Sequence, residues 1–188
     1  MKIDVFLKTI KQFPKPFYKL VDLEKIFHQD KITVQKSIER LVKFEVINRL
    51  MKDVYILADQ PIDLTSIAAV LYQPSYLSFE SVLFKHGIIN QPPFGATFAT
   101  TRRSKKLDLS NGEFWFSQIK PALWWGFELQ DGIFTAGPEK AIVDMLYLKA
   151  LGQRLFDTDE WYLKSIDKKI LVSYLKKAGI PRDKIDLV

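Results

Sequence analysis

Three basic side chains share one face of a predicted helix in the first quarter of the chain. Lys36, Arg40 and Lys43 follow one another at intervals of four and three residues, which places them together on a helix surface. Cations presented in this way contact the phosphates of a nucleic-acid backbone, and Gln35, near the start of the same helix, is placed to read a base edge. The alternative for such a face is a charged surface that only meets solvent.

Two further groups of cations are candidates for contact with phosphates. Arg49 and Lys52 lie around the turn of a predicted hairpin. The densest positive cluster of the sequence lies in a predicted connection between two later strands and consists of Arg102, Arg103, Lys105 and Lys106. A loop can present several cations to one nucleic-acid backbone, and the alternative is again a charged loop exposed to solvent.

Residue types that carry out catalysis or bind metals do not combine into a site. There is no cysteine, and the two histidines, His28 and His86, have no carboxylate beside them at ligand spacing. Glu139 and Asp144 share a predicted helix but point to different faces, so we do not expect a catalytic pair. The sequence also lacks a glycine-rich loop for phosphates. We expect neither an enzyme nor a bound cofactor.

Two other conspicuous groups have structural interpretations. Ser78 is predicted to cap a helix with Glu80 in its first turn, and neither Ser78 nor Ser81 has a base at a suitable spacing. Aromatic residues alternate in the predicted strands at Trp115, Trp124, Trp125 and Phe127. We expect these rings in the core of a sheet rather than on a platform that stacks bases.

The basic helix belongs to a recognisable order of elements within residues 1–60. Helices are predicted over residues 3–11, from a cap at Asp22 to Phe27, and from a cap at Thr33 onward. Two short β-runs, Val46–Leu50 and Val54–Leu57, follow. Helix, helix, turn, helix and hairpin in this order are typical of a winged helix-turn-helix, whose basic helix enters a groove of duplex DNA.

Residues 61–188 are predicted to form a second domain of the α+β class. Strands are predicted over residues 94–100, 106–109, 113–119, 122–129 and 133–135, and helices over 63–71, 78–86, from 137 onward and over 168–178. Asn111-Gly112 and Asp131-Gly132 are strong hairpin turns. They indicate a meandering, largely antiparallel sheet flanked by the helices.

The charge balance agrees with a polyanionic partner. The 188 residues include 28 basic and 22 acidic side chains, a net charge of +6, and residues 1–60 contribute 12 basic against 8 acidic side chains. The sequence contains 47% hydrophobic and 27% charged residues, which is typical of globular proteins. Without a membrane-spanning apolar run or a signal-peptide pattern, we expect a cytoplasmic protein that contacts no membrane.

Several short motifs resemble those of the AbiEi-type antitoxins, which are the transcriptional-regulator half of a bacterial phage-defence toxin–antitoxin pair. They are residues 74–83 (PSYLSFESVL), residues 86–89 with Gln91, residues 136–144 (AGPEKAIVD) and the Val54-Tyr55 pair. The resemblance extends from about residue 5 to about residue 150. This family usually has glycine before the Val-Tyr pair and at the end of the recognition helix, where this chain has Asp53 and Phe44-Glu45.

The resemblance implies a function that the residues alone do not. It implies a repressor that binds repeats in its own promoter as a monomer or weak dimer. It also implies an antitoxin of the type IV class that counteracts a nucleotidyltransferase-like toxin without a stable complex. The alternative hypothesis is a protein-interaction module in which the winged helix is a dimer or partner surface.

Overall fold

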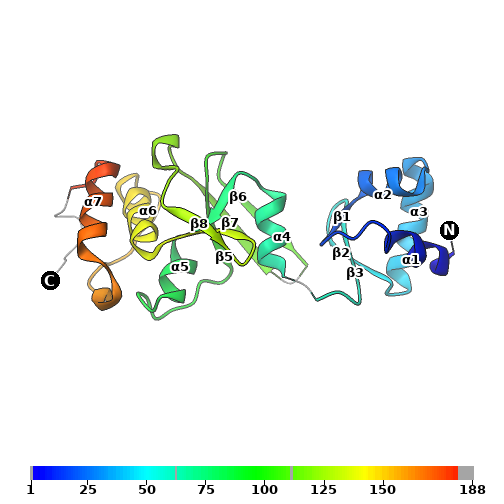
Figure 1. Cartoon of the computed structure of the whole chain (residues 1–188), viewed down its shortest axis with the longest axis horizontal. Helices are drawn as coiled ribbons and strands as arrows, with labels where there is room; N and C mark the ends of the chain where they lie inside the picture. Colours follow the sequence, from blue (N-terminus) through cyan, green and yellow to red (C-terminus); the bar gives the residue numbers. More distant parts are fainter. Residues whose placement is uncertain (1, 62, 111, 182–188) are drawn as a thin grey trace. The chain divides into compact units, whose positions relative to one another are not determined.

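The computed structural model describes residues 2–61, 63–110 and 112–181, which form two compact units (Figure 1). The first unit comprises the chain up to Ile67 together with a short segment that begins at Asp108. The second unit comprises residues 68–107 and the chain from Gly112 onward. Helices, an antiparallel sheet and a mixed sheet are present, so the predicted α+β class is confirmed.

Residues 2–61 of the first unit form three helices and a three-stranded antiparallel sheet. Its elements are α1 (Ile3–Ile10), β1 (Tyr18–Lys19), α2 (Leu20–Phe27), α3 (Lys31–Lys43), β2 (Ile47–Met51) and β3 (Val54–Leu57). The strand order is β1-β3-β2, so the first short strand joins the hairpin. The helices enclose a small apolar core in which Phe6, Ile10, Leu23, Ile38 and Leu41 are buried.

The predicted caps of α2 and α3 are wrong by a few residues. Helix α2 begins at Leu20, and Asp22 lies inside its first turn, where its carboxylate accepts the N–H of Lys19 at 2.9 Å. Asp30 caps α3 by accepting the N–H of Thr33 at 3.0 Å, and the Thr33 hydroxyl donates to the same carboxylate. In both helices a carboxylate accepts the backbone donors because its negative charge complements the positive end of the helix dipole.

Two residues beside the hairpin have a left-handed backbone conformation. Glu45, just after α3, has φ +54°, and Asp53, in the turn between β2 and β3, has φ +61°. These are the positions at which the resembled family usually has glycine. The backbone at both positions has a shape suited to glycine although the chain carries side chains there.

The remaining elements build a larger sheet with helices. They are α4 (Leu64–Leu71), β4 (Ser75–Leu77), α5 (Glu80–Lys85), β5 (Ala96–Thr100), β6 (Lys105–Leu109), β7 (Gly112–Gln118), β8 (Phe127–Gln130), β9 (Ile133–Ala136), α6 (Pro138–Ala150) and α7 (Lys168–Ala178), with short 3₁₀ turns at Pro121–Leu123 and Leu163–Ser165. Helix α6 contacts both α5 and α7, and α6 and α7 lie side by side (Figure 1).

The predicted meander is wrong because the strand order is β6-β7-β5-β4-β9-β8. β4 pairs parallel with β9, and β5 pairs parallel with β7, whereas β4–β5 and β8–β9 are antiparallel. The three-residue strand β4 was not predicted, yet it lies in the middle of the sheet. The run predicted as a strand over residues 122–129 is a strand only from Phe127 onward, in β8, because the residues before it form the end of a 3₁₀ turn and a loop.

The helix predictions in the second unit hold better. Helix α6 has proline at its first position, as predicted, and α7 has its predicted bounds, followed by Gly179 at φ +73°. Gly87 at the end of α5 has φ +66°, the left-handed conformation expected there. Across the residues that the structure describes, every helix is too short or too polar to cross a bilayer.

Candidate nucleic-acid interface

Helix α3 divides cleanly into a buried and an exposed face. Val34, Ile38 and Leu41 are buried against the first core, as their helical spacing predicts. The three predicted phosphate-binding residues Lys36, Arg40 and Lys43 are all exposed. The basic face is therefore on the surface of the first unit.

A hollow of about 420 Å³ separates α3 from the β2–β3 hairpin. Gln35 and Glu39 line it from the helix, and Arg49 and Lys52 line it from the hairpin. The Arg49 side chain is held by the hairpin itself, because its Nε donates to the carbonyl of Met51 at 3.3 Å. The structure thus brings together Gln35, Arg49 and Lys52 from the predicted set, while Lys36, Arg40 and Lys43 lie on the exposed surface of α3.

A second hollow of about 400 Å³ reveals two cations that sequence reasoning missed. Lys19 and Lys31 line it, and Lys52 in the hairpin turn lines both hollows. Lys19 precedes the first residue of α2, and Lys31 is the first residue of α3. Backbone N–H groups at the start of a helix often bind phosphates, and a lysine beside them can contact the same phosphate. The position of Lys19 and Lys31 at helix starts is therefore the sequence signal that could have found them.

The Arg102–Lys106 cluster is less free than its charge suggests. The Arg102 guanidinium donates to the carbonyl of Gln73 at 3.0 Å and lies 4.2 Å from the centre of the Tyr72 ring. The Lys105 ammonium lies 5.3 Å from the same ring. Tyr72 thus gathers two of the predicted cations on one surface through cation–π contacts.

The other two residues of this cluster differ in their surroundings. Lys106 forms an ion pair of 2.6 Å with Glu113 on the neighbouring strand β7, which offsets its charge. The Arg103 side chain is exposed, and its carbonyl accepts the Tyr72 hydroxyl at 2.8 Å. Phosphate binding by this cluster therefore stays a prediction that rests mainly on Arg102, Arg103 and Lys105.

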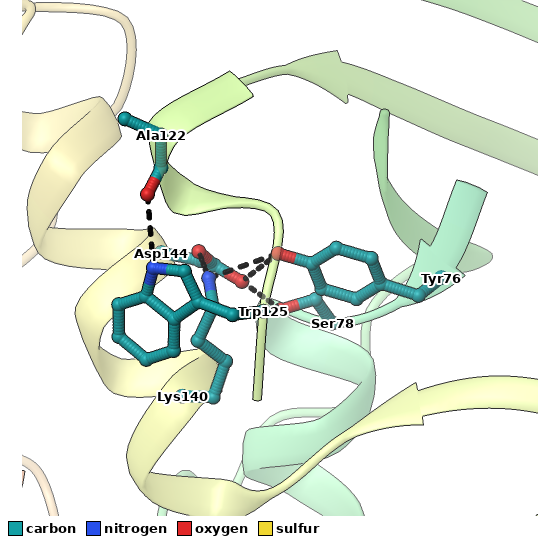
Figure 2. A network of polar contacts seen from close by, with 6 residues as sticks. All are labelled: Tyr76, Ser78, Ala122, Trp125, Lys140 and Asp144. Atoms are coloured by element: carbon teal, nitrogen blue, oxygen red, sulfur yellow. Dashed lines mark hydrogen bonds and ion pairs between the residues drawn. The ribbon is translucent and has the colours of Figure 1, made fainter. Parts of the chain in front are cut away.

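A buried polar network at the start of α6 was missed by the sequence analysis (Figure 2). Lys140 and Asp144, one helical turn apart, form an ion pair with no exposed surface. The Tyr76 hydroxyl and the Ser78 hydroxyl each donate to Asp144 at 2.8 Å, and the Lys140 ammonium donates to the Tyr76 oxygen at 2.9 Å. Ser78 is therefore not the predicted helix cap, because its hydroxyl binds Asp144 instead.

Burial is the largest influence on the pKa values of Lys140 and Asp144. It lowers the pKa of Lys140 and raises the pKa of Asp144, and the attraction between the two groups opposes both shifts. Tyr76 and Ser78 are themselves completely buried. A substrate cannot reach any of these four groups, so the network is a part of the core rather than a catalytic site.

Trp124 and Trp125, the tryptophans beside this network, are partly buried and lie outside the strands in which they were predicted. Trp124 and Phe127 pack against the Tyr76 ring with centroid distances of 5.1 and 4.4 Å. Trp125 donates from its indole N–H to the carbonyl of Ala122 at 2.9 Å, and the Lys140 ammonium lies 4.9 Å from its ring (Figure 2). These rings cover the buried ion pair.

Comparison with known proteins identifies no family. Neither a scan against protein-family models nor a search of the curated proteins found a match to the chain.

Proposed function

We propose that the first unit is a winged helix-turn-helix that binds duplex DNA. In this interpretation α3 is the recognition helix and the β2–β3 hairpin is the wing. The observation that carries the proposal is the hollow between α3 and the hairpin, which Gln35, Arg49 and Lys52 line together. A helix that reads bases and a hairpin that contacts phosphates need this adjacency to bind one stretch of DNA.

The exposed cations supply the electrostatic part of the binding. Lys36, Arg40 and Lys43 are exposed on α3, and Lys19 and Lys31 add two lysines near the wing. Their contacts with phosphates would position the protein without reading sequence. Gln35 and Arg40 are the residues that we assign to base recognition.

We further propose that the protein is a transcriptional repressor and an antitoxin. The support is the resemblance of residues 74–83 and 136–144 to the AbiEi-type antitoxins. Such a protein represses its own operon at promoter repeats, as a monomer or weak dimer, and counteracts a nucleotidyltransferase-like toxin without forming a stable complex. The second unit would then carry the antitoxin function.

A gel-shift assay with a triple variant tests the DNA-binding proposal. Changing Lys36, Arg40 and Lys43 together to alanine should abolish the shift of the promoter fragment of the chain's own gene. The matched control changes Lys168, Lys169 and Lys176, which are exposed on α7, and it removes the same charge from the second unit. Both variants should melt within a few degrees of the parent protein, because exposed substitutions usually change stability by less than about 0.5 kcal/mol.

The same variants test the antitoxin proposal. The α3 triple variant should still protect cells that express the toxin of the operon, although it no longer represses. Loss of protection in a variant that remains folded would contradict the assignment of the two functions to separate units.

A second candidate function has one observation in its favour. Val21 and Ile32 are 52% and 65% exposed in the first unit, and apolar residues of this kind suit a protein partner. Undiminished promoter binding by the α3 triple variant would exclude α3 as the recognition helix. Absence of DNA binding by the parent chain, combined with dimers that the Ile32→Lys change disrupts, would favour this interaction module.

A further inference from the structure

Strand β8 lies at one edge of the six-stranded sheet, and among the described residues β9 is its only strand partner. The opposite edge strand, β6, begins with Lys105 and Lys106, and lysines at a sheet edge discourage pairing with another chain. β8 has the sequence Phe-Glu-Leu-Gln, and its last three side chains are exposed. Its second side is therefore open to a further strand.

The pairing of β8 with β9 decides which backbone groups face this open side. The Gly137 N–H donates to the Gly126 carbonyl at 3.2 Å, so these two opposite residues form a hydrogen-bonded pair. Hydrogen-bonded pairs alternate with pairs that make no hydrogen bonds. Glu128 and Gln130 are therefore bonded to β9, whereas the N–H and C=O of Leu129, between them, point to the open side.

Leu129 also carries an exposed apolar surface. It is 63% exposed and lies opposite Phe134 of β9, which is 50% exposed. Their side chains share a face of the hairpin with Phe127, whose ring centre lies 5.7 Å from that of Phe134. Apolar side chains beside an unpaired edge suit a strand that adds further apolar side chains to the same face.

The residues of β8 are complementary to a second β8 strand. In an antiparallel pair centred on Leu129, each Leu129 lies opposite its copy, and each Glu128 lies opposite Gln130 of the other copy. The two leucines exchange their outward N–H and C=O groups, and each glutamine amide can donate to a carboxylate. A pair centred on Glu128 would place two carboxylates opposite each other, which is destabilising.

We propose that two copies of this chain pair through their β8 strands and join their sheets. Leu129 and Phe134 of both copies form an apolar cluster on one face, and the contacts between Glu128 and Gln130 form on the other. Few residues take part on each side, so the association is weak, as small interfaces usually are. It involves only the second unit and does not depend on the proposed DNA binding.

Sedimentation velocity of the full chain over a concentration series tests the dimer. The parent chain should form dimers, and nothing larger, as its concentration approaches about 1 mM, because a two-fold contact is closed. Leu129→Lys should leave the chain monomeric, since it places two cations opposite each other at the centre of the pair. Leu155→Lys is the matched control, because Leu155 is 96% exposed elsewhere in the second unit, and it should dimerise like the parent. A monomeric parent, larger assemblies, or dimers that Leu129→Lys leaves intact would overturn the proposal.

Changes at the exposed Gln130 test the register of the pair. Gln130→Lys should tighten the dimer about tenfold, because it places an ammonium group opposite Glu128 of the other copy at two symmetric positions. Gln130→Glu should weaken the dimer about tenfold, and adding Glu128→Lys to it should recover the dimer by restoring opposite charges. In a chain of net charge +6, overall charge alone would give the reverse order. Equal effects of Gln130→Lys and Gln130→Glu, or effects in the reverse order, would exclude this register and overturn the proposal.

Discussion

Lys140 and Asp144 show how a charged pair can be retained in a core. Each group loses its hydration on burial, which costs several kcal/mol per ion. The hydroxyls of Tyr76 and Ser78 supply further hydrogen bonds to Asp144, and the Tyr76 oxygen accepts from Lys140. The pair is stable only because its remaining donors and acceptors are also satisfied.

Removing one member of the pair should therefore be costly. Lys140→Met should lower the free energy of unfolding by about 3–5 kcal/mol, since it leaves the Asp144 carboxylate buried without its cation. Lys140→Met combined with Asp144→Leu should cost clearly less than the sum of the two single changes. Urea unfolding of the three variants measures this coupling, and a cost below about 1 kcal/mol for Lys140→Met would contradict the described network.

Glu45 is a position where a substitution should stabilise the protein. A side chain in the left-handed region costs roughly 1–2 kcal/mol, whereas glycine there loses about 0.5–1 kcal/mol of chain entropy on folding. Glu45→Gly should therefore raise the free energy of unfolding by about 0.5 kcal/mol. Glu45→Ala is the control because it removes the same carboxylate but keeps the Cβ atom, and it should bring no gain. Equal effects of both changes would show that the carboxylate, not the backbone, matters.

At the scale of elements, the starts of α2 and α3 depend on ionised carboxylates. Burial raises the pKa of Asp22, but hydrogen bonds from Lys15 and from the N–H of Lys19 outweigh this effect and leave it below its usual 3.8. The hydroxyl and N–H of Thr33 lower the pKa of Asp30. A carboxyl group whose pKa is lower in the folded state stabilises the fold above its unfolded pKa and loses this contribution as the pH falls through the folded pKa.

The free energy of unfolding of the first unit should therefore fall as the pH drops below about 4. The double variant Asp22→Asn with Asp30→Asn should flatten this acid dependence, because the amides cannot titrate while Asn can still cap a helix. Urea unfolding between pH 2 and pH 6, followed at the backbone NMR signals of α2 and α3, gives the measurement. Asp59→Asn, an exposed change in the same unit, should keep the full dependence.

The elements also show what local patterns can and cannot predict. The periodicity of apolar residues and the Gly and Pro signals predicted the bounds of α7 and the start of α6, because these depend on neighbours in sequence. The order of the sheet was not predictable in this way, since β4 has only three residues and pairs with β9 across a long interval. Of the candidate site, the exposed face of α3 followed from spacing, and Lys19 and Lys31 could have been found from their positions at helix starts. The contacts of Tyr76 and Ser78 with Asp144 could not, because these residues are more than 60 positions apart in sequence.

At the scale of the whole molecule, charge should govern the affinity for DNA that we propose for this protein. Each phosphate that the protein neutralises contributes about 0.9 to the slope of log K against log salt concentration. Removing Arg102, Arg103 and Lys105 together should flatten this slope and weaken promoter and random DNA by similar factors. Lys106→Ala is the matched control, because its charge is already offset by Glu113. An unchanged slope in the triple variant would show that the cluster contacts no phosphate and is a charged loop exposed to solvent.

The hydrogen bond between Tyr76 and Asp144 also has a consequence for the order in which the chain can fold during synthesis. The two residues are 68 positions apart, and the central strand β4 cannot form this bond until α6 has been made. A ribosome that adds about 5–20 residues per second needs roughly 3 to 14 seconds for this interval. During synthesis the residues up to Ile67 are made first. Tyr76 and Ser78 follow, but their partner Asp144 is made only later. The growing chain thus passes through a stage at which the residues of its first helices have been made and the partners of its central strand have not.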